Sequence, residues 1–346
     1  MDNDSSGFVT TSFDDLVNND SLNKMLSNYE IPELVNCILK TSKKDEFIEK
    51  AKNGYFKLNV NNLRTFHNVL KGELINNVTL FINNQNNQNN NINLLDLAVG
   101  KAGDMSKWIH SGINFVYGVD ISSNSIKEAI SRIKNNKQLK NSNTKISLAV
   151  ADVSNYKDTI NLIKKNKINK FNIVSCQFAL HYFFKTKESL NNLLRVVSES
   201  LLINGFFIGT FIDSSKIKEL LGKKKTVDTP LFTITKNYNN TKNNYYGNEY
   251  SFLIKDSLTN YFQSYGSSIE YLVDIPELNR VAAEYNLVPL NLNPFDYFRL
   301  SNESTINFKD IYSNNYKDYS GNRIILTPEE KELSFLNSVF IFVKIK

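Results

Sequence analysis

The stretch Asn93-Leu-Leu-Asp-Leu-Ala-Val-Gly-Lys-Ala-Gly-Asp104 decides the fold of this 346-residue chain. Its leucines predict a short buried strand, and the small-residue turn behind them leads into a helix beginning near Met105. A second apolar run, residues 115 to 119, ends in Asp120. Such a turn and such an acid bind a nucleoside in an α/β sheet, because the backbone approaches the ligand closely and the carboxylate accepts hydrogen bonds from the ribose hydroxyls.

The middle of the chain alternates apolar strand patterns with amphipathic helix patterns, which predicts a doubly wound α/β sheet. Strands are expected at 94–97, 115–120, 145–150, 171–177 and 206–212. Helices are expected at 105–110, at about 159–166 and at 190–201. Another helix should follow the second strand, with Ser122 or Ser123 as its N-cap. The end of the chain, 332–344, is strand-like and suits a closing strand of the same sheet.

The pattern changes between residues 216 and 330. A helix is expected at 216–221, then two paired strands at 231–238 and 249–254 joined by an Asn-rich loop, and then a helix at 277–286. We therefore expect one domain over 51–346, with a core of 93–215 and 331–346 and an insertion over 216–330. Residues 1–50 are expected to form an N-terminal extension that is partly disordered or helical. A helix at 62–75 should place its apolar stripe on one face and its charged residues mostly on another.

Composition excludes several classes of protein. Charged residues make up 22% and hydrophobic ones 41%, which is typical of a globular protein. No apolar run approaches the roughly 18 residues that a membrane-spanning helix needs. With only two cysteines, neither a disulfide framework nor a cysteine-based zinc site is expected, which favours an intracellular setting. The net charge of +6 permits a polyanionic partner without requiring one.

Polar residues follow successive strands of the predicted sheet. Gly100 and Asp104 follow the first strand, Asp120 ends the second, Asp152 follows the third, and Gln177 ends the fourth. Because ligands bind beyond the carboxyl ends of such strands, these residues predict an adenosine pocket. Asp120 would hold the ribose and Asp152 the adenine amino group, with Gln177 near the reactive end.

Two nucleoside cofactors suit such a sheet, NAD and S-adenosylmethionine. A G-x-G-x-x-G turn with a backbone bed for pyrophosphate is typical of NAD sites. Here the turn has only two glycines, and Asp104 would repel a diphosphate. The ammonium group of S-adenosylmethionine instead needs a carboxylate partner, so the turn favours S-adenosylmethionine.

At several motifs the chain resembles messenger-RNA cap (guanine-N7) methyltransferases, from about Asn62 to its C-terminus. The family's R-N-F-N-N-W-x-K is similar to Arg64-Thr-Phe-His-Asn-Val-Leu-Lys71. Its L-D-L-G-C-G-K-G-G-D-x-x-K-W resembles residues 95–108, and its S-C-Q-F-x-x-H-Y resembles residues 175–182. The family's G-x-F-I-G-T strand recurs at 205–210. In its Asn-rich composition the chain resembles the members of this family from large DNA viruses.

The resemblance implies a Rossmann-like class I methyltransferase fold, with a mostly parallel seven-stranded sheet and the insertion before the last strands. It also implies a role for each matching residue. The residues expected at S-adenosylmethionine are Lys71, Ala98, Gly100, Asp104, Asp120, Asp152 and Gln177. The residues expected at the cap are His67 and Asn68 near the RNA, Lys101, Lys107 and Arg132 at the phosphates, and His181, Tyr182 and Glu270 at the guanine.

Three departures from the family pattern concern four positions. Ala98 and Ala102 replace glycines of the turn, and His67 replaces an asparagine. An aromatic residue of the family's final strand has no match here, and Asn337 lies near that position.

The resemblance implies methyl transfer to guanine N7 of a GpppN cap on messenger RNA. Since N7 carries an in-plane lone pair, we expect no general base, no nucleophile and no metal, only positioning and electrostatics. The alternatives are a methyltransferase with a non-cap substrate and a catalytically inactive capping subunit that binds RNA or a partner. The expected partners are capped RNA and an RNA triphosphatase–guanylyltransferase or RNA polymerase, with no membrane. The expected location is the nucleus for a cellular protein, and a cytoplasmic viral factory or the virion for a viral one.

Overall fold

A computed structural model describes residues 61–85, 91–166, 168–239, 244–255, 267–290, 305–313 and 315–346. The predicted N-terminal extension lies outside the described residues. The main sheet has the strand order β10-β12-β5-β4-β1-β2-β3, and β11 pairs with β12 as an eighth strand. Its strands are β1 (Asn93–Leu97), β2 (Phe115–Asp120), β3 (Lys145–Val150), β4 (Phe171–Gln177), β5 (Leu201–Ile212), β10 (Leu287–Pro289), β11 (Thr305–Asn307) and β12 (Asn337–Lys344).

The strands β1 to β5 run parallel to one another, whereas β12 runs antiparallel to β5, β10 and β11. This confirms the predicted α/β fold with a mostly parallel sheet. The strand order reverses at β1, where β2 and β4 lie on either side. A crevice opens at such a point beyond the strand ends, and it is the usual place for a ligand.

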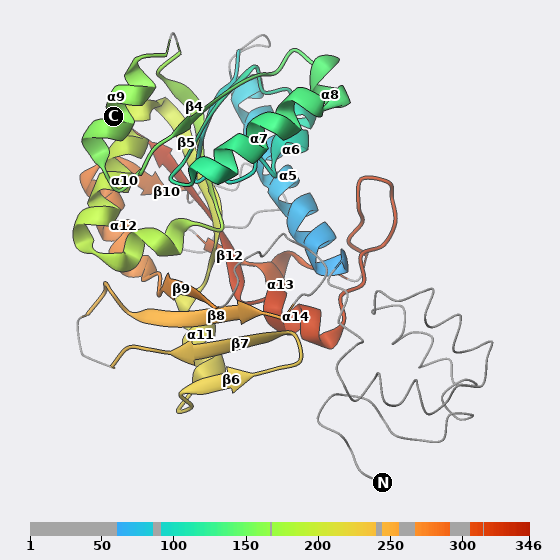
Figure 1. Ribbon diagram of the computed structural model, residues 1–346, viewed down its shortest axis with the longest axis vertical. Coiled ribbons are helices and arrows are strands. Elements are labelled where there is room, and N and C mark those ends of the chain that lie inside the picture. The colour runs from blue at the N-terminus through green and yellow to red at the C-terminus, as the bar shows by residue number, and fades with distance from the viewer. Residues whose placement is uncertain are drawn as a thin grey trace, which may run out of the picture.

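Helices cover both faces of the main sheet (Figure 1). On one face lie α5 (Asn61–Gln85), α6 (Met105–His110), α7 (Ser123–Asn135) and α8 (Lys137–Lys140). On the other lie α9 (Tyr156–Lys164), α10 (Lys187–Ser200) and α12 (Ile275–Glu284). Side chains of β5 point alternately to the two helix layers. Phe206 and Ile208 pack with α5, whereas Phe207 and Phe211 pack with α10. Among the described helices, none is both long and apolar enough to cross a membrane.

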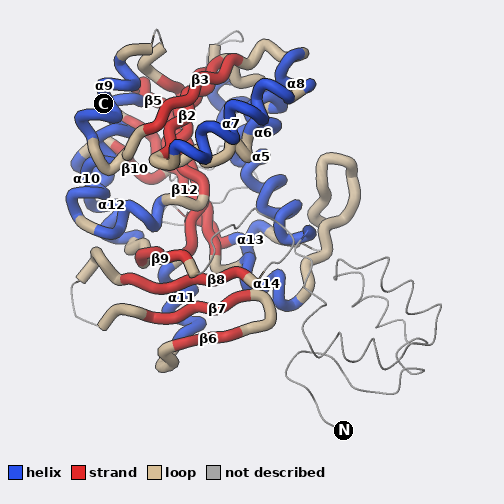
Figure 2. The backbone as a smooth tube through the Cα atoms, in the orientation of Figure 1, coloured by secondary structure: helices blue, strands red, loops and turns tan. Residues whose placement is uncertain are grey.

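A second, antiparallel sheet lies against the strand ends of the main sheet (Figure 2). It has the order β6 (Thr226–Asp228), β7 (Phe232–Lys236), β8 (Glu249–Ile254), β9 (Ser268–Tyr271), and α11 (Ser214–Leu221) leads into it. The register pairs Tyr250 with Glu270 and Phe252 with Ser268, so these four side chains share one face. Tyr250, Phe252 and Glu270 are buried, which shows that this face is turned inward.

The predicted extent of the insertion, 216–330, does not match one structural unit. Within it, α12 and β10 belong to the layers of the main sheet, and β11 pairs with β12. The sequence gives no hint of this because β10 and β11 are each only three residues long. The structure also has a 3₁₀ helix over Leu180–Lys185 and a short helix α13 (Phe308–Ile311).

The single strand expected over 332–344 is wrong in its first part, because α14 (Pro328–Ser334) precedes β12. Thr327 accepts a hydrogen bond from the backbone of Glu330, and the Glu330 carboxylate accepts one from the backbone of Thr327. This capping box, with Pro328 in the first turn, starts a helix that overrides the strand-like pattern.

Candidate active site

One cavity of about 750 Å³ lies beyond the carboxyl ends of β1, β4 and β5. Its wall is made by α5, the turn after β1, α7, the inward face of the second sheet, and the junction of α14 and β12. Most of the predicted site residues line it, namely His67, Lys71, Ala98, Gly100, Lys101, Asp104, Arg132, Gln177, His181, Tyr182 and Glu270. The structure therefore brings together residues that are up to about 200 positions apart in the chain.

The turn after β1 is tied to the end of β2 by Asp120. Its carboxylate accepts hydrogen bonds from the backbone N–H of Gly100 at 2.7 Å and of Ser122 at 2.8 Å. Ala98, Gly100 and Ala102 have φ angles of 59°, 53° and 54°. The two alanines thus adopt the left-handed conformation that glycine tolerates and other residues resist. No atom lies within 4 Å of a Cβ built at Gly100, which leaves open space beside the turn.

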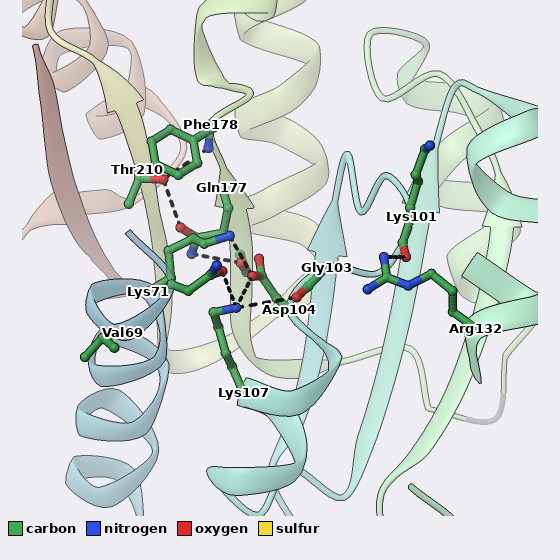
Figure 3. A network of polar contacts seen from close by, with 12 residues as sticks. Val69, Lys71, Lys101, Gly103, Asp104, Lys107, Arg132, Gln177, Phe178 and Thr210 are labelled. Atoms are coloured by element: carbon green, nitrogen blue, oxygen red, sulfur yellow. Dashed lines mark hydrogen bonds and ion pairs between the residues drawn. The ribbon is translucent and has the colours of Figure 1, made fainter. Parts of the chain in front are cut away.

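Asp104 is the centre of a buried ion cluster (Figure 3). Its carboxylate lies 2.6 Å from the Lys71 ammonium and 2.8 Å from the Lys107 ammonium. Burial alone would raise the pKa of Asp104, but the two lysines outweigh it and hold that pKa far below its usual range. The cluster joins α5 to the start of α6 and stands at the cavity wall through Lys71 and Asp104.

Lys107 and Asn68, which were predicted to contact the RNA cap, belong to this cluster and do not line the cavity. Lys107 is 5% exposed and donates a hydrogen bond to the side chain of Asn68 at 2.8 Å. Burial lowers the pKa of Lys107, and Asp104 opposes that shift. Neither Lys107 nor Asn68 is part of the cavity wall. The geometry therefore does not support the predicted contact of Lys107 with the cap phosphates.

At the end of β4, Phe178 is held in a strained conformation with a φ angle of 52°. Its ring stacks on His67, with centroids 5.4 Å apart and planes at 27°, and the Lys71 ammonium lies 5.6 Å from its centroid. The His67 ring nitrogen pairs with the Ser334 hydroxyl of α14 at 2.9 Å. Burial, followed by the charge of Lys71, lowers the pKa of His67 to about 3, so this ring is neutral near pH 7.

A buried polar group faces the cavity from η1 (Leu180–Lys185) and β9. His181 is 3% exposed, and neither of its ring nitrogens has a hydrogen-bond partner among the described residues. Burial lowers the pKa of His181, and the nearby Glu270 carboxylate, 3.8 Å away, opposes that shift. Glu270 itself accepts hydrogen bonds from Tyr250 at 2.8 Å and from Ser268 at 2.9 Å. Buried polar nitrogens without partners are uncommon and point to a polar ligand.

Cationic side chains reach the cavity from the turn and from α7. Lys101 pairs with Glu128 at 2.8 Å. Arg132 donates a hydrogen bond to the backbone carbonyl of Lys101 at 2.6 Å (Figure 3). Glu128 also lines the cavity. The cationic patch is therefore partly neutralised by a carboxylate that the sequence did not single out.

Asp120 and Asp152 lie at adjoining strand ends but outside the cavity wall. One oxygen of the exposed Asp152 carboxylate accepts hydrogen bonds from the backbone and hydroxyl of Ser154. Two apolar side chains beside them are unusually open to solvent, Ile121 at 68% and Val150 at 48% exposed. Asp120 pairs in register with Val150, so a carboxylate and two uncovered apolar groups share this edge.

Residues 42–345 match the family model of the mRNA (guanine-N(7))-methyltransferase domain. The chain belongs to this family. The described strand order accordingly represents a Rossmann-like class I methyltransferase fold.

Curated relatives from fungi and animals are similar to the chain. The mRNA cap guanine-N(7) methyltransferase of Saccharomyces cerevisiae is 32% identical over 251 residues, which are 68% of this chain and 53% of that protein. The protein of the same name from Caenorhabditis elegans is 37% identical over 158 residues, 45% of this chain and 40% of that protein. The chain thus spans about half the length of such relatives. The resemblance to viral versions stays a prediction.

Among solved structures, an S-adenosylmethionine-dependent methyltransferase from Clostridium acetobutylicum matches with a TM-score of 0.45 and 15% identity. That match covers 77% of this chain and 90% of the other.

Besides Glu128, no site role was predicted for Asp96 and Phe178, which also line the cavity. Asp96 is 3% exposed, and burial, together with the charge of Asp104, raises its pKa well above the usual range. Phe178 is part of the motif at residues 175–182, but no role was predicted for it. An acid between leucines in the predicted strand was the available signal for Asp96. Asn337, near the unmatched aromatic position, lines the cavity and donates hydrogen bonds to two backbone carbonyls of α14.

Proposed function

We propose that this chain transfers the methyl group of S-adenosylmethionine to N7 of the guanine in the GpppN cap of messenger RNA. One observation carries the proposal. Lys71, Asp104 and Gln177, which the family resemblance assigns to the methyl donor, line the same cavity as His181, Tyr182 and Glu270, which it assigns to the guanine. A reaction between the two ligands needs such a shared space.

The residues present fit S-adenosylmethionine. Lys71 offers an ammonium to the ligand's carboxylate, and Asp104 offers a carboxylate to its ammonium. Each Asp120 oxygen accepts one backbone hydrogen bond and retains capacity for the ribose hydroxyls. Ile121 and Val150 leave apolar surface uncovered where an adenine ring would lie. When bound, S-adenosylmethionine supplies a methyl group activated by its sulfonium charge.

The groups around His181 fit a guanine edge. Because burial keeps the imidazole neutral, one ring nitrogen of His181 donates and the other accepts a hydrogen bond. The Glu270 carboxylate can accept from the guanine N1–H and amino group while Tyr250 and Ser268 hold it in place. Positive charge develops on the guanine during methyl transfer, so a nearby carboxylate stabilises the transition state more than the ground state.

Lys101 and Arg132 line the cavity, as do Arg64 and Lys71, but of these four only Lys101 and Arg132 stand at positions that the family resemblance assigns to the cap phosphates. We assign the phosphate role to these two residues and give Lys107 and Asn68 a supporting role behind Asp104. The second sheet, β6 to β9, is the part of the predicted insertion that we assign to the cap side, because Glu270 and Ser268 lie on it.

This substrate requires a preceding guanylyl transfer to a diphosphate RNA end. We therefore propose capped RNA as the partner, and an RNA triphosphatase–guanylyltransferase or RNA polymerase as the source of that RNA. The location would follow the site of RNA synthesis, which is the nucleus for a cellular protein and a viral factory or the virion for a viral one.

Two substitutions test the proposal by separating the ligands. Asp120→Asn removes one carboxylate charge at the ribose site and should weaken S-adenosylmethionine binding at least about tenfold in calorimetry. Glu270→Gln should leave that binding within about twofold and lower methylation of GpppA-capped RNA by about a hundredfold. Normal methylation by both variants, or absence of S-adenosylmethionine binding by the unmodified chain, would refute the proposal.

A further inference from the structure

Thr210, on β5, contacts the site without lining the cavity. Its side chain is fully buried, and its hydroxyl touches two residues that do line it (Figure 3). The hydroxyl oxygen accepts a hydrogen bond from the backbone N–H of Phe178 at 3.1 Å. The hydroxyl proton is donated to the side-chain carbonyl of Gln177 at 3.0 Å. Thr210 therefore lies outside the cavity but hydrogen-bonds Gln177 and Phe178 on its wall.

The direction of these hydrogen bonds follows from the chemistry of the groups. A backbone N–H only donates, and a hydroxyl has a single proton to give. The Thr210 proton therefore goes to Gln177, which must turn its oxygen toward Thr210. The Gln177 amide nitrogen then donates to the Ser175 hydroxyl at 3.2 Å, and Ser175 in turn hydrogen-bonds the Asp96 carboxyl group.

An inverted amide would break this chain. With its nitrogen toward Thr210, Gln177 would give the hydroxyl a second donor and deprive the hydroxyl proton of its acceptor. Leaving a buried polar group without its partner costs more than an ordinary hydrogen bond contributes. The amide nitrogen of Gln177 has two protons, and Ser175 uses one. The other remains for a ligand in the cavity.

We propose that Thr210 is a positioning residue that orients the Gln177 amide so that an N–H donor faces an acceptor atom of the bound methyl donor. This inference rests on the proposed function. The Phe178 N–H donates to the backbone carbonyl of Thr210 as well, at 2.8 Å. That second acceptor survives a side-chain substitution, so Phe178 keeps its strained conformation when the hydroxyl is removed.

The test compares Thr210→Val, which has the same shape and no hydroxyl, with Thr210→Ser, which keeps the hydroxyl. Calorimetry with S-adenosylmethionine on the full chain should give about fivefold weaker binding for Thr210→Val and no more than about twofold for Thr210→Ser. In methyl-transfer assays, KM for S-adenosylmethionine should rise about fivefold in Thr210→Val, while kcat and KM for capped RNA stay unchanged.

A double-mutant cycle with Gln177→Met separates positioning from a general structural effect. In the Gln177→Met background, Thr210→Val should weaken binding no further, since no amide remains to orient. Equal weakening in both backgrounds, or wild-type affinity of Thr210→Val, would overturn the inference. If Thr210→Val does not fold, Thr210→Ala removes the same hydroxyl from a smaller side chain and enters the same cycle. Failure of the unmodified chain to bind S-adenosylmethionine would instead overturn the proposed function.

Discussion

The stability of the turn after β1 can be tested at Ala98, a residue other than glycine that adopts a φ angle of 59°. A Cβ in the left-handed region costs roughly 1–2 kcal/mol, which Ala98→Gly would remove. Glycine also gives the unfolded chain more freedom, which costs about 0.4–1 kcal/mol. The half-buried methyl group contributes little to packing. Ala98→Gly should therefore stabilise the fold by about 0.5 kcal/mol, whereas most substitutions destabilise.

The matched control is Ala283→Gly, an exposed position inside the helix α12. Glycine there should destabilise by about 0.5–1 kcal/mol. Ala102→Gly should fall between the two, because Ala102 has a φ angle of 54° but its methyl group is fully buried. Losing that methyl group costs about 0.8 kcal/mol, which slightly exceeds the gain of about 0.5 kcal/mol from the relieved strain.

Urea unfolding of the three variants, followed by circular dichroism, measures these differences directly. The expected order of stability is Ala98→Gly, Ala102→Gly, Ala283→Gly, with about 1–1.5 kcal/mol between the first and the last. If Ala98→Gly lost as much stability as Ala283→Gly, the strain argument for the turn would be refuted.

Three further predictions concern the charged groups. Asp104→Asn should lower the free energy of unfolding by about 3–5 kcal/mol in urea titrations, because both buried lysine ammonium groups lose their carboxylate partner; a loss below about 1 kcal/mol would contradict the cluster. Glu128→Gln should lower KM for capped RNA about two- to fivefold by releasing Lys101 for the phosphates, whereas Glu188→Gln, an equal charge change on α10, should not. For His67, whose pKa falls from 6.5 to about 3 on folding, the unfolded state takes up the proton first. Stability should thus fall as the pH drops from about 6.5 to about 3, by up to about 1.4 kcal/mol per pH unit, and a His67→Asn variant should lack this component.

The strands of the main sheet could be predicted closely from the sequence. Residues 115–120, 145–150 and 171–177 were expected as strands, and the structure places β2, β3 and β4 at the same residues. Compact apolar runs bounded by polar turns carry this information locally. The predicted strand at 332–344 failed in its first part because helix α14 is started by the reciprocal bonds of Thr327 and Glu330, which outweigh an ambiguous pattern.

The candidate site was predictable where residues follow directly from strand ends. Gly100, Asp104, Asp120, Asp152 and Gln177 came from that rule. Three of them line the cavity, whereas Asp120 and Asp152 lie outside its wall. The directions of long side chains were not predictable. Lys107 points back to Asp104 three residues earlier, because α5 brings Asn68 and Lys71 against the start of α6. The Lys101–Glu128 pair likewise depends on how α7 packs beside the turn.

Methyl transfer from labelled S-adenosylmethionine to GpppA-capped RNA tests the central claim most directly, with m7GpppA-capped RNA as the matched control. The two RNAs differ only in the methyl group at guanine N7. The account predicts that label enters the first RNA and not the second. Label in both RNAs, or in neither, would contradict it.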